Sequence, residues 1–237
     1  MDHTDQIAVE LTLAIRSGDI PALERLLASR PGLATARITG PKGPDAGIRT
    51  PLHIVADWPG YFPAGPAVAG ILLRSGADPD ARTAEGHGGE TPLHWTASSD
   101  DADVAEALIS GGADIEAPDG SIGTPLENAV GYGCWHVARL LAARGARVDK
   151  LWTAAALGIL PRVEELLGPD LTADDLNEAF WQACHGGQRR AAEMLLNRGA
   201  DPSAVPGYSG QTAVQAAAAP GTRRENLAGW LRQRAGD

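Results

Sequence analysis

Apolar residues recur at helical spacing in short stretches, and each stretch ends at glycine. Val104, Ala107 and Leu108 lie on one face of a helix if that segment is helical. Gly111 and Gly112 follow this stripe, and glycine accepts the left-handed backbone that a helix end requires. The pattern predicts a short helix that stops at the glycine pair.

A second helix is predicted just upstream, in the sequence TPLHWTA. Thr91 can cap its N-terminus, and Pro92 stands at the first helical position, where a missing N–H has no cost. After the glycine pair, residues 114–123 read as a turn before TPLE begins at Thr124, 33 residues after Thr91. The unit is therefore two short helices and a turn.

A 33-residue period that opens on T-P-L-H-x-A is similar to the ankyrin repeat. The resemblance implies an all-α repeat solenoid, in which stacked helix-turn-helix repeats are joined by β-turn fingers. The high content of Gly (29) and Pro (17) fits short helices and tight turns better than a sandwich or a doubly wound sheet.

When the 33-residue period is applied to the whole chain, 1–237, it predicts a single domain of about six helix pairs. The first pair lacks TPLH and reads as an N-terminal cap, and the fourth and fifth units lack room for a finger. Thr172 and Asp175 make a capping box for a longer first helix in the fifth unit. The predicted units are 1–35 (cap), 50–76, 91–112, 124–145, 151–168, 172–199 and 211–237 (cap).

One repeat carries an insertion between its two helices. Its glycine terminus, Gly76, lies 26 residues after Thr50, whereas the reference repeat takes 21. The extra residues belong to 57–66, DWPGYFPAGP, which is a stiff Pro/aromatic insertion loop that could form a wall or lid. The finger at 81–90 is three residues longer than usual and includes His87.

Charge and composition exclude some classes of binding partner. A net charge of −10 argues against nucleic acid, whose phosphates require a basic surface. No apolar run reaches membrane-spanning length and no signal peptide is visible, so we expect a cytoplasmic protein that does not bind membranes. The two cysteines have no disulfide or metal-ligand spacing, which fits a reducing compartment. Polar caps predict a monomer.

The ankyrin resemblance places recognition on the finger tips and on the two residues after each first helix. At these and neighbouring positions the chain carries aromatic and polar residues, which favour binding hot spots. Two centres are predicted, because residues four repeats apart cannot share a small pocket. One lies in the three repeats that begin at Thr50, Thr91 and Thr124. The other gathers Trp152, Trp181, His185 and the finger at 206–208. The candidate binding residues are Trp58, Tyr61, Trp95, Ser98, Glu127, Tyr132, Trp181 and His185.

Several of these residues also have a structural interpretation. His53 and His94 belong to TPLH, where the family's histidine bonds backbone in the turn. Glu127 and Trp181 replace that histidine in the third and fifth units. Trp95 can pack against the next repeat, and a histidine at a helix end such as His185 is stabilised by the helix dipole.

Two functions remain. The favoured one is a binding module whose acidic, aromatic concave groove holds a protein partner. No nucleotide, hydrolase or zinc motif occurs, so the alternative is an enzyme without cofactor or metal. It would use Asp57, Glu90 and His94 for acid–base dehydration, isomerisation or cyclisation of an apolar small molecule. A closed cavity under the insertion loop would favour the enzyme.

Overall fold

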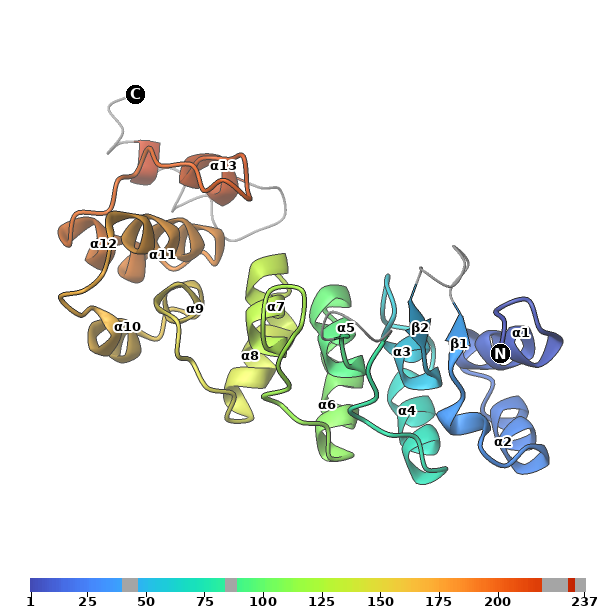
Figure 1. Ribbon diagram of the computed structural model, residues 1–237. Coiled ribbons are helices and arrows are strands. Elements are labelled where there is room, and N and C mark those ends of the chain that lie inside the picture. Colours follow the sequence, from blue (N-terminus) through green and yellow to red (C-terminus); the bar gives the residue numbers. More distant parts are fainter. Residues whose placement is uncertain (40–46, 84–88, 219–229, 233–237) are drawn as a thin grey trace. The chain divides into compact units, whose positions relative to one another are not determined.

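The computed structural model describes residues 1–39, 47–83, 89–218 and 230–232, which form two compact units, Met1–Ala146 and Arg147–Asp237 (Figure 1). The predicted all-α repeat fold is confirmed in both. The longer fingers at 36–49 and 81–90 extend into residues 40–46 and 84–88, so their tips and His87 lie outside the described residues.

The described residues of unit 1 form four helix pairs. The first helices contact one another in series, the second helices do the same, and the two rows form two layers (Figure 1). The pairs are α1 (Gln6–Ser17) with α2 (Ile20–Ser29), α3 (Pro51–Ala56) with α4 (Gly65–Arg74), α5 (Pro92–Ser99) with α6 (Ala102–Ser110), and α7 (Pro125–Tyr132) with α8 (Trp135–Ala143).

Small elements join the first two pairs. A 3-10 turn, Leu33–Thr35, follows α2. Strands β1 (Ile38–Thr39) and β2 (Ile48–Arg49) then pair antiparallel, with Ile38 opposite Arg49 and Thr39 opposite Ile48. The predicted extended finger is thus present at its base.

The TPLH sequences begin their helices as predicted. Thr50, Thr91 and Thr124 are N-caps with capping boxes, and a proline follows each of them. The leucine of each motif is buried in the core, together with small residues such as Ala97. Small buried side chains let neighbouring helices approach closely, which explains the low aromatic content.

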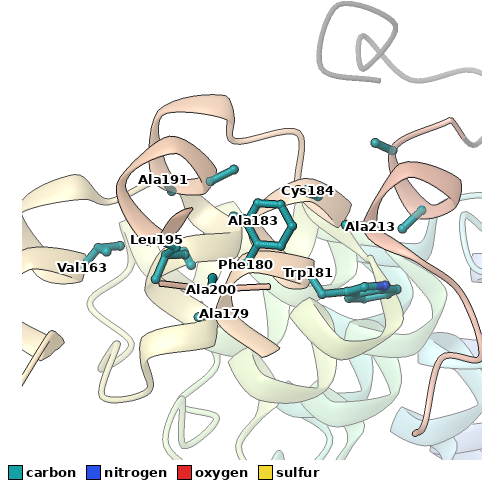
Figure 2. Packing of buried hydrophobic residues seen from close by; sticks show 14 of the residues in the cluster. Val163, Ala179, Phe180, Trp181, Ala183, Cys184, Ala191, Leu195, Ala200 and Ala213 are labelled. Atoms are coloured by element: carbon teal, nitrogen blue, oxygen red, sulfur yellow. The ribbon is translucent and has the colours of Figure 1, made fainter. Parts of the chain in front are cut away.

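Unit 2 contains α9 (Leu151–Leu157), α10 (Leu160–Leu166), α11 (Ala173–His185), α12 (Arg189–Asn197) and α13 (Ala213–Ala217). The predicted capping box of Thr172 and Asp175 starts α11, which at 13 residues is longer than the first helices of the TPLH repeats. Its core places Phe180 and Trp181 among alanines (Figure 2). The connections before α9 and α11, residues 144–150 and 167–172, are shorter than residues 111–124 before α7. The absence of fingers at these two junctions stays a prediction.

The insertion loop is shorter than its sequence indicated. Residues 57–64 are loop, but Gly65 and Pro66 already belong to α4. Proline is tolerated there because the first turn of a helix has no intrahelical partner for its N–H.

Within the described ranges, no helix combines the length and apolar character needed to cross a bilayer.

Candidate functional site

The two TPLH histidines of unit 1 join one repeat to the next. The backbone N–H of Thr50 donates to Nδ1 of His53 (3.2 Å), so Nε2 carries the hydrogen and donates to the Glu90 carbonyl (3.0 Å). His94 repeats this arrangement with Thr91 (3.2 Å) and with the Gly123 carbonyl (3.1 Å). Each acceptor carbonyl belongs to the residue just before the next N-cap threonine.

Burial lowers the pKa of His53 to about 4 and also lowers the pKa of His94. Glu90 lies close enough to His94 to raise the pKa of the imidazole, but burial has the larger effect. Both rings are fully buried and neutral at pH 7. Both histidines therefore have the geometry expected of a structural role, in which the TPLH histidine bonds backbone groups in the turn.

Trp181 makes the corresponding link in unit 2. Its indole N–H donates to the carbonyl of Gln211 (2.8 Å), the residue before the N-cap Thr212. The side chain is 5% exposed. Trp181 thus lies in the core and joins α11 to the following repeat. The sequence analysis had selected it as a binding residue and did not predict this link.

Two other repeats differ at this position. Glu127 accepts the backbone N–H of its own N-cap, Thr124 (3.0 Å), and a carboxylate cannot donate to a carbonyl. Trp152 stands at the corresponding place in α9, before the left-handed Gly158, as Trp181 stands before the left-handed Gly187.

A hydrogen-bond network covers the finger-side face of the second and third TPLH repeats. Asn128 donates through Nδ2 to Glu90 Oε1 (2.9 Å) and to Ser121 Oγ (3.2 Å), and its Oδ1 accepts the backbone N–H of Ile122 (2.9 Å). Glu90 also accepts the Ser121 backbone N–H (3.1 Å), and Ser121 Oγ lies 2.8 Å from the Tyr132 hydroxyl. The network fixes the finger against α7.

This network fixes two large side chains, those of Tyr132 and Ile122, in positions where they are exposed to solvent. Tyr132 is 51% exposed and Ile122 is 43% exposed, and Ile122 lies directly over Gly131. Trp95 is half-buried, with its ring edge-on to His53 at 5.0 Å between centroids. We define the finger-side patch as Glu90, Trp95, Ile122 and Tyr132. It contains three predicted residues and one, Ile122, that the sequence analysis did not select.

Asn128 and Ser121 were also missed. Asn128 is fully buried on a helix whose other inward residues are apolar, and a polar residue within such a stripe was the available signal. Of the remaining predictions on this face, Ser98 is exposed at the end of α5 and donates to the Trp95 carbonyl (2.9 Å).

The insertion loop lies along the turns of the neighbouring helix pairs and is hydrogen-bonded to one of them. The backbone N–H of Tyr61 donates to Asp101 Oδ2 (2.6 Å), and its hydroxyl donates to the Asp100 carbonyl (2.5 Å). On the other side, Pro63 packs against Gly18 in the α1–α2 turn. Trp58, 75% exposed, projects from this loop into solvent.

The three acid–base candidates have structural partners. Asp57 is paired with Arg16 (2.5 Å) and with Arg49 (3.4 Å). Glu90 belongs to the network, and His94 is bonded at both ring nitrogens. The protein has surface hollows of about 500 Å³ between α1 and α2, about 540 Å³ beside α2 and α4, and about 370 Å³ in unit 2, and none of these three is lined by the loop or by the three candidates.

The second predicted centre is partly assembled. Trp181 stacks on His185 with centroids 4.8 Å apart, and the Tyr208 ring meets Trp181 edge-on at 5.7 Å. Burial, together with a smaller contribution from the charge of Glu178, raises the pKa of Tyr208 to about 12. Trp152 is half-buried against the same core, and no ring contact joins it to this group among the described residues.

The cysteines are unreactive by environment. Cys134 and Cys184 are buried and unbridged, and burial raises their pKa values to about 11 and about 12. Among the described residues, no group of three or more His, Cys, Asp or Glu side chains is placed to hold a metal ion.

Residues 64–150 match the family model described as "Ankyrin repeats (3 copies)". Glycerophosphocholine phosphodiesterase gde1 of Schizosaccharomyces pombe is 27% identical over 167 residues, which cover 59% of this chain but only 14% of that protein. Ankyrin repeat domains are generally protein–protein interaction modules.

Solved ankyrin domains have a similar fold. The human ASB11 ankyrin repeat domain superposes with a TM-score of 0.52 at 22% identity, over 93% of this chain and 96% of that one. The ankyrin repeat domain of Bcl-3, a member of the IkappaB protein family, gives 0.49 at 23% identity, over 94% and 97%. Residues 64–150 thus resemble ankyrin repeats in sequence, and the fold of the chain is that of an ankyrin-repeat solenoid.

Proposed function

We propose that this protein binds a protein partner through the finger-side patch. One observation carries the proposal: Tyr132 and Ile122 are held in solvent by a hydrogen-bond network whose other members are fixed in the structure. A rigid exposed aromatic loses little conformational freedom on binding, and such side chains are enriched among binding hot spots.

The charge of this region indicates the kind of partner. From Asp78 to Asp119 the chain has eleven acidic residues and one arginine. Many of these acids have structural roles: Asp101 accepts Val104 N–H at the start of α6, and Asp100 accepts His136 N–H at the start of α8. Their charge still attracts a basic or amphipathic segment, while the patch supplies the apolar contact.

The acid–base enzyme stays an alternative prediction, and the geometry gives it less support. Its three candidate residues line none of the three hollows, and the insertion loop is bonded to neighbouring helix turns. Monomeric state and cytoplasmic location likewise stay predictions.

Photo-crosslinking tests the proposal. A photoreactive phenylalanine at position 132 is compared with the same group at position 13, because Leu13 is also exposed (63%) but lies on α1, away from the patch. The proposal expects a protein captured from position 132 and absent from position 13. Equal capture from both positions would contradict it.

Affinity then measures the contribution of the patch. Tyr132→Ala should weaken binding of the purified partner by about 10-fold or more, the loss typical of a hot-spot residue. Leu13→Ser removes a comparable exposed apolar side chain and should change the Kd by less than about twofold. Isothermal calorimetry provides both values.

A further inference from the structure

A second concave site lies on unit 2, beside the N-terminal half of α11. This hollow of about 370 Å³ is bounded on one side by Asp174, Asn177 and Glu178, which share a helix face at i, i+3 and i+4. The segment 204–208 forms the opposite wall. Their spacing along α11 directs the three polar side chains toward one space.

Both walls are held in place. The Asp201 backbone N–H donates to Asn177 Oδ1 (2.7 Å), which fixes the start of the opposing segment on α11. Gln182 Nε2 lies 3.2 Å from the Tyr208 hydroxyl, and the Tyr208 ring contacts Trp181. The hollow is therefore preformed.

The hollow is acidic without a cation. Its lining contains two carboxylates, of Asp174 and Glu178, and no lysine, arginine or histidine. Neither carboxylate has a salt bridge or hydrogen bond to a described residue, whereas the neighbouring Asp175 is bonded to Thr172. Burial raises the pKa of Glu178, and the charge of Asp175 raises it further. A cation placed here would relieve this unfavourable charge.

The opposite wall is apolar and aromatic. Val205 is 49% exposed and Tyr208 is 61% exposed. Behind Tyr208 the Gln182 side chain is 2% exposed, and its Oε1 has no hydrogen-bond partner among the described residues. A buried polar atom without a partner is uncommon, and Nε2 of the same amide meets the Tyr208 hydroxyl.

We propose that this hollow binds a lysine or arginine side chain of a protein partner. The charged head would lie between Asp174 and Glu178, and the alkyl stem would lie along Val205 and Tyr208. Long basic side chains combine an apolar stem with a charged tip, and their cations are attracted to aromatic rings. This site rests on the proposed protein-binding function and adds a contact on a different unit.

The test uses small probes, so it does not require the partner. N-acetyl-arginine amide and N-acetyl-lysine amide are titrated into the full ¹⁵N-labelled chain, with N-acetyl-norleucine amide as the uncharged analogue. Backbone resonances of 173–178 and 203–208 are followed by NMR. For the cationic probes we expect saturable shifts of these resonances with a Kd on the order of millimolar, because so small a ligand makes few contacts.

Two variants of equal net charge separate a site from general attraction to an acidic protein. Glu178→Gln should weaken binding about two- to fivefold, the range for partly exposed ion pairs. Glu164→Gln removes an exposed carboxylate on α10, outside the hollow, and should leave the Kd unchanged. Circular dichroism shows whether both variants keep the wild-type helix content.

Three outcomes would overturn the proposal: equal shifts with the norleucine analogue, equal weakening by Glu164→Gln and Glu178→Gln, or shifts outside the two segments. Because no protein partner is used in this experiment, such a failure would not contradict the proposal that the finger-side patch of unit 1 binds a protein. Conversely, failure of the crosslinking experiment at position 132 would remove the proposed function even if the probes bind here.

Discussion

Unit 1 and unit 2 join neighbouring repeats at the same backbone position with different side chains. In unit 1 an imidazole donates to the carbonyl before the next N-cap, and in unit 2 the Trp181 indole does so. Glu127, at this position in the third repeat, instead accepts the N–H of its own N-cap. An imidazole and an indole can therefore make the same link, and histidine is one solution.

The largest expected effect comes from removing the unit 2 donor. Trp181→Ala deletes a buried ring and its hydrogen bond, and should lower the free energy of unfolding by about 3–5 kcal/mol. Trp181→His keeps a ring N–H and should cost less. Urea unfolding provides these values, and hydrogen exchange should place the loss in unit 2.

Trp58→Ala is the matched control, since that indole is 75% exposed. It should change stability by no more than about 0.5 kcal/mol. Equal losses at positions 58 and 181 would mean that the Trp181 link contributes nothing specific.

Lowering the pH should weaken the link made by a histidine and leave the link made by Trp181 unchanged. His53 has a pKa of about 4 when folded against an ordinary 6.5, so the unfolded chain takes up the proton first as pH falls. Its stabilising effect is complete above about pH 6.5 and is lost progressively toward pH 4. The difference of about 2.5 pKa units corresponds to about 3 kcal/mol. An indole does not titrate in this range.

His53→Gln tests this dependence. Glutamine already occupies the same capping-box position at Gln215, so the helix start should survive. The variant should flatten the dependence of the free energy of unfolding on pH between 6.5 and 4, measured by urea titration at several pH values. An unchanged slope would show that His53 does not titrate as its burial implies.

A smaller effect is expected where the insertion loop meets the first helix pair. Gly18 has φ of +67°, and an added Cβ would overlap the Pro63 carbonyl oxygen. Gly76 also has positive φ (+91°) but has open space around it. Gly18→Ala should therefore cost about 1–2 kcal/mol more than Gly76→Ala in thermal or urea unfolding. Equal costs would show that the loop contact is not stabilising.

The smallest effect should lie at the turn between α7 and α8. Asp100 accepts the backbone N–H groups of His136 (2.9 Å) and Val137 (3.0 Å), and its carboxylate also meets the exposed His136 ring (2.7 Å). Asp100→Ala should cost about 1 kcal/mol through lost capping. His136→Ala removes only an exposed contact between an imidazole and the Asp100 carboxylate and should cost less than about 0.5 kcal/mol in the same unfolding assay. The reverse order would assign the stability to the imidazole contact.

Local signals in the sequence were sufficient for much of the fold. The N-cap at Thr91, the capping box at Thr172 and the glycine ends of helices depend on residues a few positions apart. The site depended on longer contacts. Asp57 pairs with Arg16 across 41 positions and Trp181 reaches Gln211 across 30, so neither role was visible in a local pattern.

The same reason explains the residues that were missed. Ile122 reads as part of a turn, and only the bond from its N–H to Asn128 shows that the turn is fixed with this side chain outward. The division into Met1–Ala146 and Arg147–Asp237 was also not predicted, although it falls where the repeat spacing first shortens, before the unit 151–168.

The insertion loop has a consequence for how the repeats unfold. Stacked repeats behave approximately as a one-dimensional Ising chain, in which each unit is coupled only to its nearest neighbours. The loop strengthens the coupling on both sides of its own repeat, through Gly18 before it and through Asp100 and Asp101 after it. The first three helix pairs should consequently melt as one cooperative block, in which a short and otherwise marginal repeat such as 50–76 has no independent melting transition.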